Sequence, residues 1–295
     1  MKKMCEKGIG LGRRQLLLGA LPALVLGAQG AQAQEELTGM ARIRAAGALK
    51  VAVYNAFAPF SYRTGKGMEG LDVDLAKALA QQMGLQMTLL PFDADEDMND
   101  DLRNMVWKGH YLGYGPADVM LHVPVDKYFQ QNNKQAVIFA PYLREQVVLA
   151  RDTRRLPKVG KAEDLKGVPL AAERGTGAAS ALIGHENHML SSQVQIYEDG
   201  IKAMQAVLDG KAAAAYITRA QAETAIFQAN PKPEHIEITD FPLQGVPRDG
   251  WPVGMAIKSG NDELGKELVQ ALTALRSNGQ LLALFKQHGL TLVTP

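Results

Sequence analysis

The chain has almost no cysteine, and this scarcity excludes most disulfide and thiol chemistry. Among its 295 residues, the only cysteine is Cys5, so one chain cannot form an internal disulfide bond. Long apolar runs are also missing after residue 33, where no segment approaches the roughly 18 consecutive apolar residues of a membrane-spanning helix. We therefore expect no membrane insertion of the chain that follows residue 33.

The sequence also lacks an excess of either charge. It has 32 basic and 31 acidic residues. Residues 1–33 hold five of the basic residues and one of the acidic ones, so the remainder has a net charge of −3. A mildly acidic chain without a basic stripe is not expected to bind nucleic acid. The length that remains suffices for one large domain or two medium lobes with real cores.

The first 33 residues predict an export signal. Basic residues come first, at Lys2, Lys3, Lys7, Arg13 and Arg14. The apolar segment Leu16–Leu26 follows, and the small residues Ala31 and Ala33 end it in the pattern that a signal peptidase reads. We expect a periplasmic mature protein. The Arg13-Arg14 pair favours twin-arginine export, with ordinary secretion as the open alternative.

From Leu49 onwards, short apolar runs alternate with longer stretches of helical spacing, which predicts an α/β fold. The expected strands are residues 49–54, 87–92, 118–123, 146–151, 168–173, 194–197, 212–217 and 252–257. The expected helices are residues 72–83, 101–108, 175–184, 200–208, 220–229, 262–278 and 281–288. In open α/β sheets, ligands bind beyond the carboxyl ends of the strands, so we expect the site in the loops there.

The order of several segments resembles the family 3 solute-binding proteins, the polar amino-acid class that serves ABC transporters. The segments are LKVAVYNAFAPFSY, GLDVDLAKALAQQMG, ADVML, APYLREQVVLAR, AAERGTGAAS, KAMQAVLDGKAAAAYITRAQAE and WPVGMAIKSGNDELGKELVQALTALRSNGQ. This resemblance implies a fold like that of type II periplasmic binding proteins, with two α/β lobes joined by two hinge strands. It places lobe 1 at residues 34–145 plus 246–295 and lobe 2 at residues 146–245.

The AERGTGAAS turn is the strongest candidate for ligand contact. Gly175 lets the backbone approach a ligand closely, and Thr176 can donate a hydroxyl or cap the following helix. An ordinary capped turn is the alternative interpretation. Phe57 lies where the family places an aromatic residue that packs on the ligand, although a lone phenylalanine is more often a core residue.

Two expected determinants of amino-acid binding are missing. The resemblance implies an arginine for the α-carboxylate and an acidic residue for the α-ammonium, but the segment HVPVDKYF offers only Lys127 and the second position holds Thr218. A lysine cannot reproduce the bidentate arginine contact. The remaining basic and polar candidates are His122, Lys127, Arg144, Arg174, Thr176 and Thr218. These residues predict a small acidic ligand, while Arg144 and Arg219 could equally be solvated or paired with Glu145 and Glu223.

An insertion in the segment VWKGHYLGYGPADV predicts an aromatic surface loop. It carries Trp107, His110, Tyr111 and Tyr114. Aromatic residues of this kind can anchor a protein partner. Packing over the ligand cleft and packing on the loop's own lobe are the alternatives.

No sequence motif predicts an enzyme or a metal site. Asp93, Asp95 and Asp97 alternate like calcium ligands, but Met98 and Asn104 occupy the positions that an EF-hand loop requires to be Gly and Glu. We therefore expect no metal and no cofactor. An acid/base pair such as His122 with Asp126 could act without a motif, so a hydrolase or dehydratase stays an open alternative.

The sequence thus favours a monomeric periplasmic solute-binding protein that gives a small ligand to an ABC permease. The alternative is an accessory module of a periplasmic quinoprotein (PQQ-dependent) alcohol dehydrogenase, acting in maturation or cofactor handling, with PQQ as its ligand. Family-3-like proteins without the amino-acid determinants suggest this second function by resemblance alone.

Overall fold

The computed structural model describes residues 37–295, so the predicted export signal at residues 1–33 lies outside the described residues. Residues 37–295 form one unit with two five-stranded sheets and one three-stranded sheet. Within this range, no helix combines the length and the apolar character needed to cross a membrane. The predicted α/β fold class is confirmed.

The first five-stranded sheet combines parallel and antiparallel strands. Its order is β5 (Gln86–Phe92), β1 (Ala48–Tyr54), β6 (Val119–Pro124), β13 (Trp251–Lys258) and β7 (Ala136–Glu145). Strands β5, β1 and β6 are parallel, and β13 runs antiparallel to β6 and β7. The three-stranded sheet follows β1 and contains β2 (Ala56–Phe57), β3 (Ser61–Thr64) and β4 (Gly67–Glu69).

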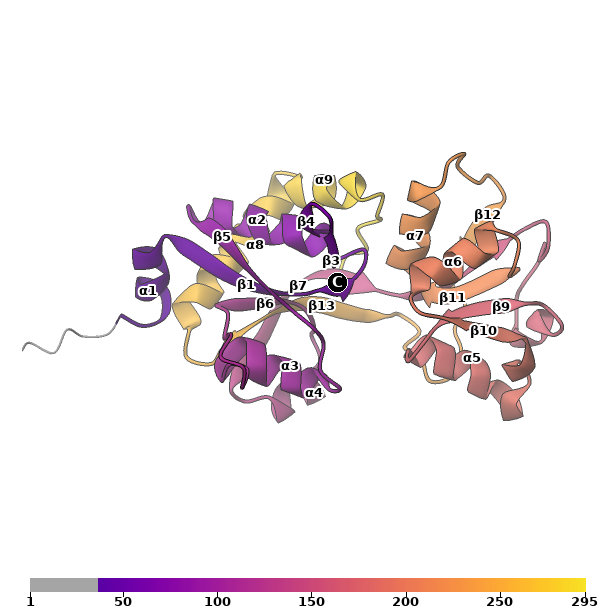
Figure 1. Ribbon diagram of the computed structural model, residues 1–295, viewed down its shortest axis with the longest axis horizontal. Helices are drawn as coiled ribbons and strands as arrows, with labels where there is room; N and C mark the ends of the chain where they lie inside the picture. Colours follow the sequence, from indigo (N-terminus) through magenta and orange to yellow (C-terminus); the bar gives the residue numbers. More distant parts are fainter. Residues whose placement is uncertain (1–36) are drawn as a thin grey trace, which may run out of the picture. The chain divides into compact units, whose positions relative to one another are not determined.

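Helices cover both faces of this first sheet (Figure 1). One face carries α1 (Gly39–Ala46), α2 (Leu71–Gln82), α8 (Asp262–Ser277) and α9 (Gln280–Gln287). The other face carries α3 (Met98–Leu102), the π-helix η1 (Arg103–Trp107) and α4 (Lys127–Asn132). Helix α2 packs on the sheet because Leu71, Leu75 and Leu79 recur every fourth residue and are fully buried.

The second five-stranded sheet has the same layered construction. Its order is β10 (Val194–Tyr197), β9 (Leu170–Glu173), β11 (Ala214–Thr218), β8 (Val147–Asp152) and β12 (Ile236–Thr239). One face packs on α5 (Gly177–His188), and the other packs on α6 (Gly200–Leu208) and α7 (Arg219–Gln228). The short 3-10 helices η2 (Ala162–Leu165) and η3 (Ser191–Gln193) lie in connections.

The chain passes between the two sheets twice. The first passage lies between β7 and β8, around Gln146, and the second lies between β12 and β13. The division into residues 34–145 plus 246–295 and residues 146–245, implied by the family resemblance, stays a prediction. These two passages are the segments where the resemblance places its two hinge strands.

Local side-chain chemistry explains where the elements differ from their predicted ranges. The helix expected at residues 101–108 begins at Met98, because the Asp97 carboxylate caps it by accepting from the Asn99 amide at 2.9 Å. It then continues as the π-helix η1. The sequence does not predict strand β7, because Pro141 interrupts its pattern. In the structure, the neighbouring Ala140 has a positive φ of 50°.

Candidate functional site

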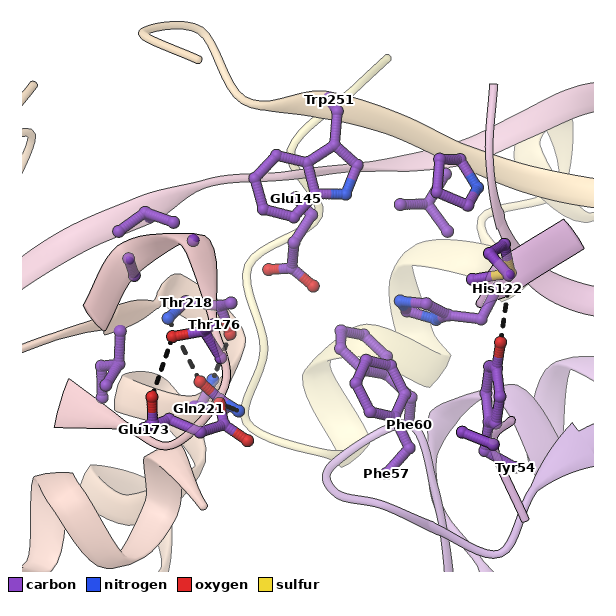
Figure 2. Close-up of a pocket in the computed structure, with 18 of the residues that line it drawn as sticks. Tyr54, Phe57, Phe60, His122, Glu145, Glu173, Thr176, Thr218, Gln221 and Trp251 are labelled. Atoms are coloured by element: carbon purple, nitrogen blue, oxygen red, sulfur yellow. Dashed lines mark hydrogen bonds between the residues drawn. The ribbon is translucent and has the colours of Figure 1, made fainter. Parts of the chain in front are cut away.

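A pocket of about 740 Å³ is lined by residues from both five-stranded sheets and their loops. In Figure 2, Phe57, Phe60, His122 and Tyr54 lie on one side and Glu173, Thr176, Thr218 and Gln221 on the other. Trp251 and Glu145 lie between these two groups in the same view. A pocket of this size can hold a small organic molecule.

Aromatic rings form one side of the pocket. The rings of Phe57 and Phe60 stack with centroids 5.4 Å apart. The His122 imidazole packs against both, at 4.7 Å from Phe57 and 4.2 Å from Phe60. Such a surface offers a ligand apolar area and aromatic contact.

An irregularity of strand β6 directs His122 into the pocket. In the pairing of β13 with β6, Gly254 lies opposite Val123 and Met255 lies opposite Leu121, so His122 has no partner. Its φ is +60°, which is uncommon for a residue other than glycine. β-Bulges of this kind re-aim side chains and are frequent beside functional sites.

A buried hydrogen-bond network holds His122 in this position. Asp72 of α2 contacts His122 Nδ1 through Oδ2 at 2.9 Å and accepts from the Tyr142 hydroxyl through Oδ1 at 2.7 Å. The Tyr142 hydroxyl also accepts from the His122 backbone N–H at 3.1 Å. Burial, followed by the nearby Asp72 charge, raises the pKa of Tyr142 well above its usual value, so the phenol stays neutral and donates.

Helix caps form the opposite side of the pocket. Thr176 caps α5 by accepting from the Ala179 amide at 3.1 Å, and its hydroxyl donates to the Glu173 carbonyl at 3.0 Å. Thr218 caps α7 in a capping box with Gln221. The Gln221 side chain also donates to the Glu173 carboxylate at 2.7 Å, while burial raises the pKa of Glu173.

Glu145 is the most unusual ionisable group of the lining. It is 4% exposed and pairs with Trp251 across β7 and β13. No hydrogen-bond partner contacts its Oε2 atom. Burial raises the pKa of Glu145 to about 7, against the opposing effects of His122 and the Gln146 backbone amide.

Further carboxyl groups line the same pocket. Asp93, Asp95 and Asp101 belong to it, and the Tyr54 hydroxyl donates to Asp101 at 2.9 Å. Burial raises the pKa of both Tyr54 and Asp101. Within residues 37–295, no cluster of three or more His, Cys, Asp or Glu side chains is arranged to hold a metal ion.

The pocket brings together half of the ligand-binding residues predicted from the sequence. Phe57, His122, Thr176 and Thr218 line it. Lys127, Arg144, Arg174 and Gly175 are not among the lining residues. Lys127, Arg174 and Gly175 are exposed, and the Arg144 guanidinium donates to the Asp249 carbonyl at 3.3 Å. Among residues 37–295, the pocket lining therefore lacks the lysine and arginine side chains that the sequence suggested.

Glu145, Glu173, Gln221 and Trp251 are among the lining residues that the sequence does not predict. A sequence signal existed only for Glu145, a carboxylate placed between the apolar residues Leu143 and Val147 in a strand-like stretch. The sequence offers Arg144 as its partner, but the Arg144 guanidinium donates to the Asp249 carbonyl instead.

The aromatic insertion packs beside its own sheet and does not belong to the pocket lining. Trp107 and Tyr114 pack against the buried cluster under α3 and η1. His110 stacks on Tyr114 with a centroid distance of 4.3 Å, whereas Tyr111 is 88% exposed. Of the three alternatives for this loop, packing over the ligand is therefore the least consistent with its position.

Comparisons with known proteins identify similar chains. The family model of bacterial extracellular solute-binding proteins, family 3, matches residues 49–104. Cyclohexadienyl dehydratase from Pseudomonas aeruginosa is 26% identical over 204 residues, covering 66% of this chain and 68% of that protein. The L-cystine-binding protein TcyJ from Escherichia coli K12 is 20% identical over 272 residues, covering 92% and 93%.

Solved structures resemble the fold over most of the chain. An ancestral cationic amino acid solute-binding protein (AncCDT-1) matches with a TM-score of 0.65 and 22% identity, covering 83% of this chain and 97% of that one. A polar amino acid ABC uptake transporter substrate-binding protein from Streptococcus thermophilus matches with a TM-score of 0.64 and 19% identity, covering 86% and 90%. The predicted resemblance is thus confirmed by the family model over residues 49–104, and the chain has a type II periplasmic-binding-protein fold.

Proposed function

We propose that this chain is a monomeric periplasmic solute-binding protein that captures a small molecule in the pocket and delivers it to an ABC permease. The observation that carries the proposal is the pocket of about 740 Å³, lined from both sheets near the two passages of the chain. Closure of two such halves around a ligand is a common mode of conformational change. A ligand that contacts both halves would favour the closed state.

The lining suggests the body of the ligand. Phe57, Phe60 and Trp251 supply aromatic surface, and the capped turns at Thr176 and Thr218 supply polar edges. The acidic ligand expected from the sequence has little support, because that expectation rested on basic residues outside the lining. A small aromatic or largely apolar molecule with a few polar groups fits these residues best.

Replacing Phe57 by alanine should weaken binding of this ligand about tenfold, which corresponds to about 1.4 kcal/mol. The substitution removes a ring that stacks on Phe60 and faces the pocket, and the buried area of an aromatic side chain accounts for a loss of this size. The ligand is first identified by thermal shift against amino acids, amines, aromatic acids and PQQ. Its affinity for each variant is then measured by calorimetry.

Tyr128→Ala is the matched control, because this aromatic side chain is 73% exposed on α4 and lies outside the pocket lining. It should bind like the unmodified protein. Equal affinities of the Phe57 and Tyr128 variants would contradict the proposed site. Absence of any stabilising solute in the screen would argue against the proposed function itself.

Elimination of water is a second candidate function. One relative is a cyclohexadienyl dehydratase. Elimination of water from such a ring breaks a carbon–oxygen bond, which an acid assists by protonating the departing hydroxyl, and loss of carbon dioxide or of a proton from the ring supplies the electron pair of the new double bond. Glu145, with a pKa of about 7 in the pocket, could supply that proton. The absence of an enzyme, expected from the sequence, stays a prediction.

If this second function holds, the rate with a hydroxylated cyclohexadienyl acid should fall as the pH rises through about 7, because the protonated Glu145 is the active form. Ultraviolet absorbance of the aromatic product measures the rate. Glu145→Gln should abolish the reaction, with Glu69→Gln outside the pocket as the control. A rate that is unchanged in Glu145→Gln would exclude this residue as the proton donor.

The accessory role beside a PQQ-dependent dehydrogenase stays a prediction that the comparisons do not support. The feature relevant to it is the exposed side of the aromatic loop, at Tyr111 and Leu112. Copurification of a dehydrogenase that is lost on Tyr111→Ala would favour this role over delivery to a permease.

A further inference from the structure

Glu145 is a carboxyl group that the protein itself leaves incompletely paired. It is 4% exposed, its Oε2 atom has no hydrogen-bond partner, and its side chain projects into the pocket beneath Trp251 (Figure 2). A buried charge without a partner is costly, so such groups are paired or neutralised in folded proteins. A ligand can therefore supply the partner that Glu145 Oε2 lacks.

The groups around Glu145 do not supply a positive charge in contact with it. Asp72 of α2 and Glu223 of α7 disfavour its ionisation, while His122 of β6 favours it. His122 already contacts Asp72 through Nδ1. The nearby Arg219 guanidinium donates to Asp240 at 2.9 Å.

The remainder of the pocket has the same electrostatic character. Its other ionisable lining residues include Asp93, Asp95, Asp101 and Glu173, and among the residues that the structure describes its lining has no lysine or arginine. Trp251 is the cross-strand neighbour of Glu145. A carboxylate beside an indole face is a suitable environment for an ammonium or another organic cation.

We propose that the ligand carries a positively charged nitrogen that lies against the Glu145 carboxylate and beside Trp251. This inference rests on the proposed solute-binding function and adds the charge of the ligand and the residue that recognises it. The ligand class is then an organic amine with an aromatic or apolar body.

Binding of such a cation is coupled to release of a proton. In the free protein, Glu145 has a pKa of about 7, so it is mostly protonated at pH 6 and mostly ionised at pH 8. A bound cation stabilises the ionised form and lowers the pKa, so the affinity rises with pH across this range. The ionised fraction increases about tenfold from pH 6 to pH 8, and the affinity should increase by the same factor.

The probe is phenethylammonium, compared with 3-phenylpropionate, which has a similar body and the opposite charge. The amine stays protonated from pH 6 to pH 8 because its pKa is near that of lysine. Calorimetry of the mature protein, in two buffers with different ionisation enthalpies, gives the affinity and the number of protons released. We expect the amine to bind about ten times more tightly at pH 8 than at pH 6, with proton release.

Glu145→Gln should weaken amine binding at pH 8 and remove its pH dependence, since glutamine keeps the shape and loses the charge. Glu69→Gln, outside the pocket lining, is the control and should keep the dependence. A Glu145→Gln variant that kept the pH dependence of the unmodified protein would overturn the assignment to Glu145.

Tighter binding of the propionate, with proton uptake, would overturn the inference and favour an acidic ligand. Failure of the amine to bind would also overturn it. If another class of solute then stabilised the protein, the proposed solute-binding function would be retained without this inference.

Discussion

Replacing Asp72 by leucine should lower the free energy of unfolding by about 4 kcal/mol, which is typical of removing one partner of a buried pair. Asp72 is 1% exposed and contacts both His122 and the Tyr142 hydroxyl. Leucine has a similar size but accepts no hydrogen bond, so both partners would stay buried with unmet hydrogen bonds. Urea unfolding measures the loss.

Asp72→Asn provides the matched control for hydrogen bonding. Its side chain keeps the shape of the carboxyl group, and its amide oxygen can accept from Tyr142. We expect it to lose less than half of the stability that leucine loses. Equal losses in the two variants would show that the charge of Asp72, and not the hydrogen-bond network, stabilises this part of the site.

Replacing Gly250 by alanine should destabilise the protein by about 3 kcal/mol, from strain in the left-handed backbone region together with overpacking. The φ of Gly250 is +66°, and an added Cβ would lie 1.9 Å from the Glu145 carbonyl oxygen. The backbone of the two passages would have to separate at the point where Glu145 and Trp251 pair. Ligand affinity should therefore fall together with stability.

Gly260→Ala separates these two causes. Gly260 has a φ of +88°, but an added Cβ there meets no atom within 4 Å. This variant should lose only about 1 kcal/mol, from backbone strain alone, and should keep its ligand affinity. If Gly250→Ala were no less stable than Gly260→Ala in urea unfolding, the close approach of the two passages would be refuted.

The layers of the fold could be predicted because their signals are local. Leu71, Leu75 and Leu79 follow one another at helical spacing, and β1 is a short apolar run that ends at a loop. The missed strand β7 contains Pro141 and a left-handed Ala140, so its pattern resembles a loop. Its place in the sheet depends on pairing with β13, which is more than 100 residues away in the sequence.

The site was less predictable because its chemistry arises from distant pairings. Thr176 and Phe57 follow strands, as ligand-contacting residues do in α/β sheets, and they line the pocket. Glu145 is buried beside Trp251 because β7 pairs with β13, and this pairing cannot be read from the local sequence. Lys127 follows the strand that carries His122 in the sequence, but it lies at the start of α4, where its side chain is exposed to solvent.

The fluorescence of Trp251 tests the central claim, small-molecule binding in this pocket, most directly. The chain has only two tryptophans, Trp107 and Trp251, and only Trp251 lines the pocket. In a Trp107→Phe variant, a solute that stabilises the protein should cause a saturable change in Trp251 emission, with the dissociation constant that calorimetry gives. A solute that binds in calorimetry but leaves Trp251 emission unchanged at saturation would contradict binding in this pocket.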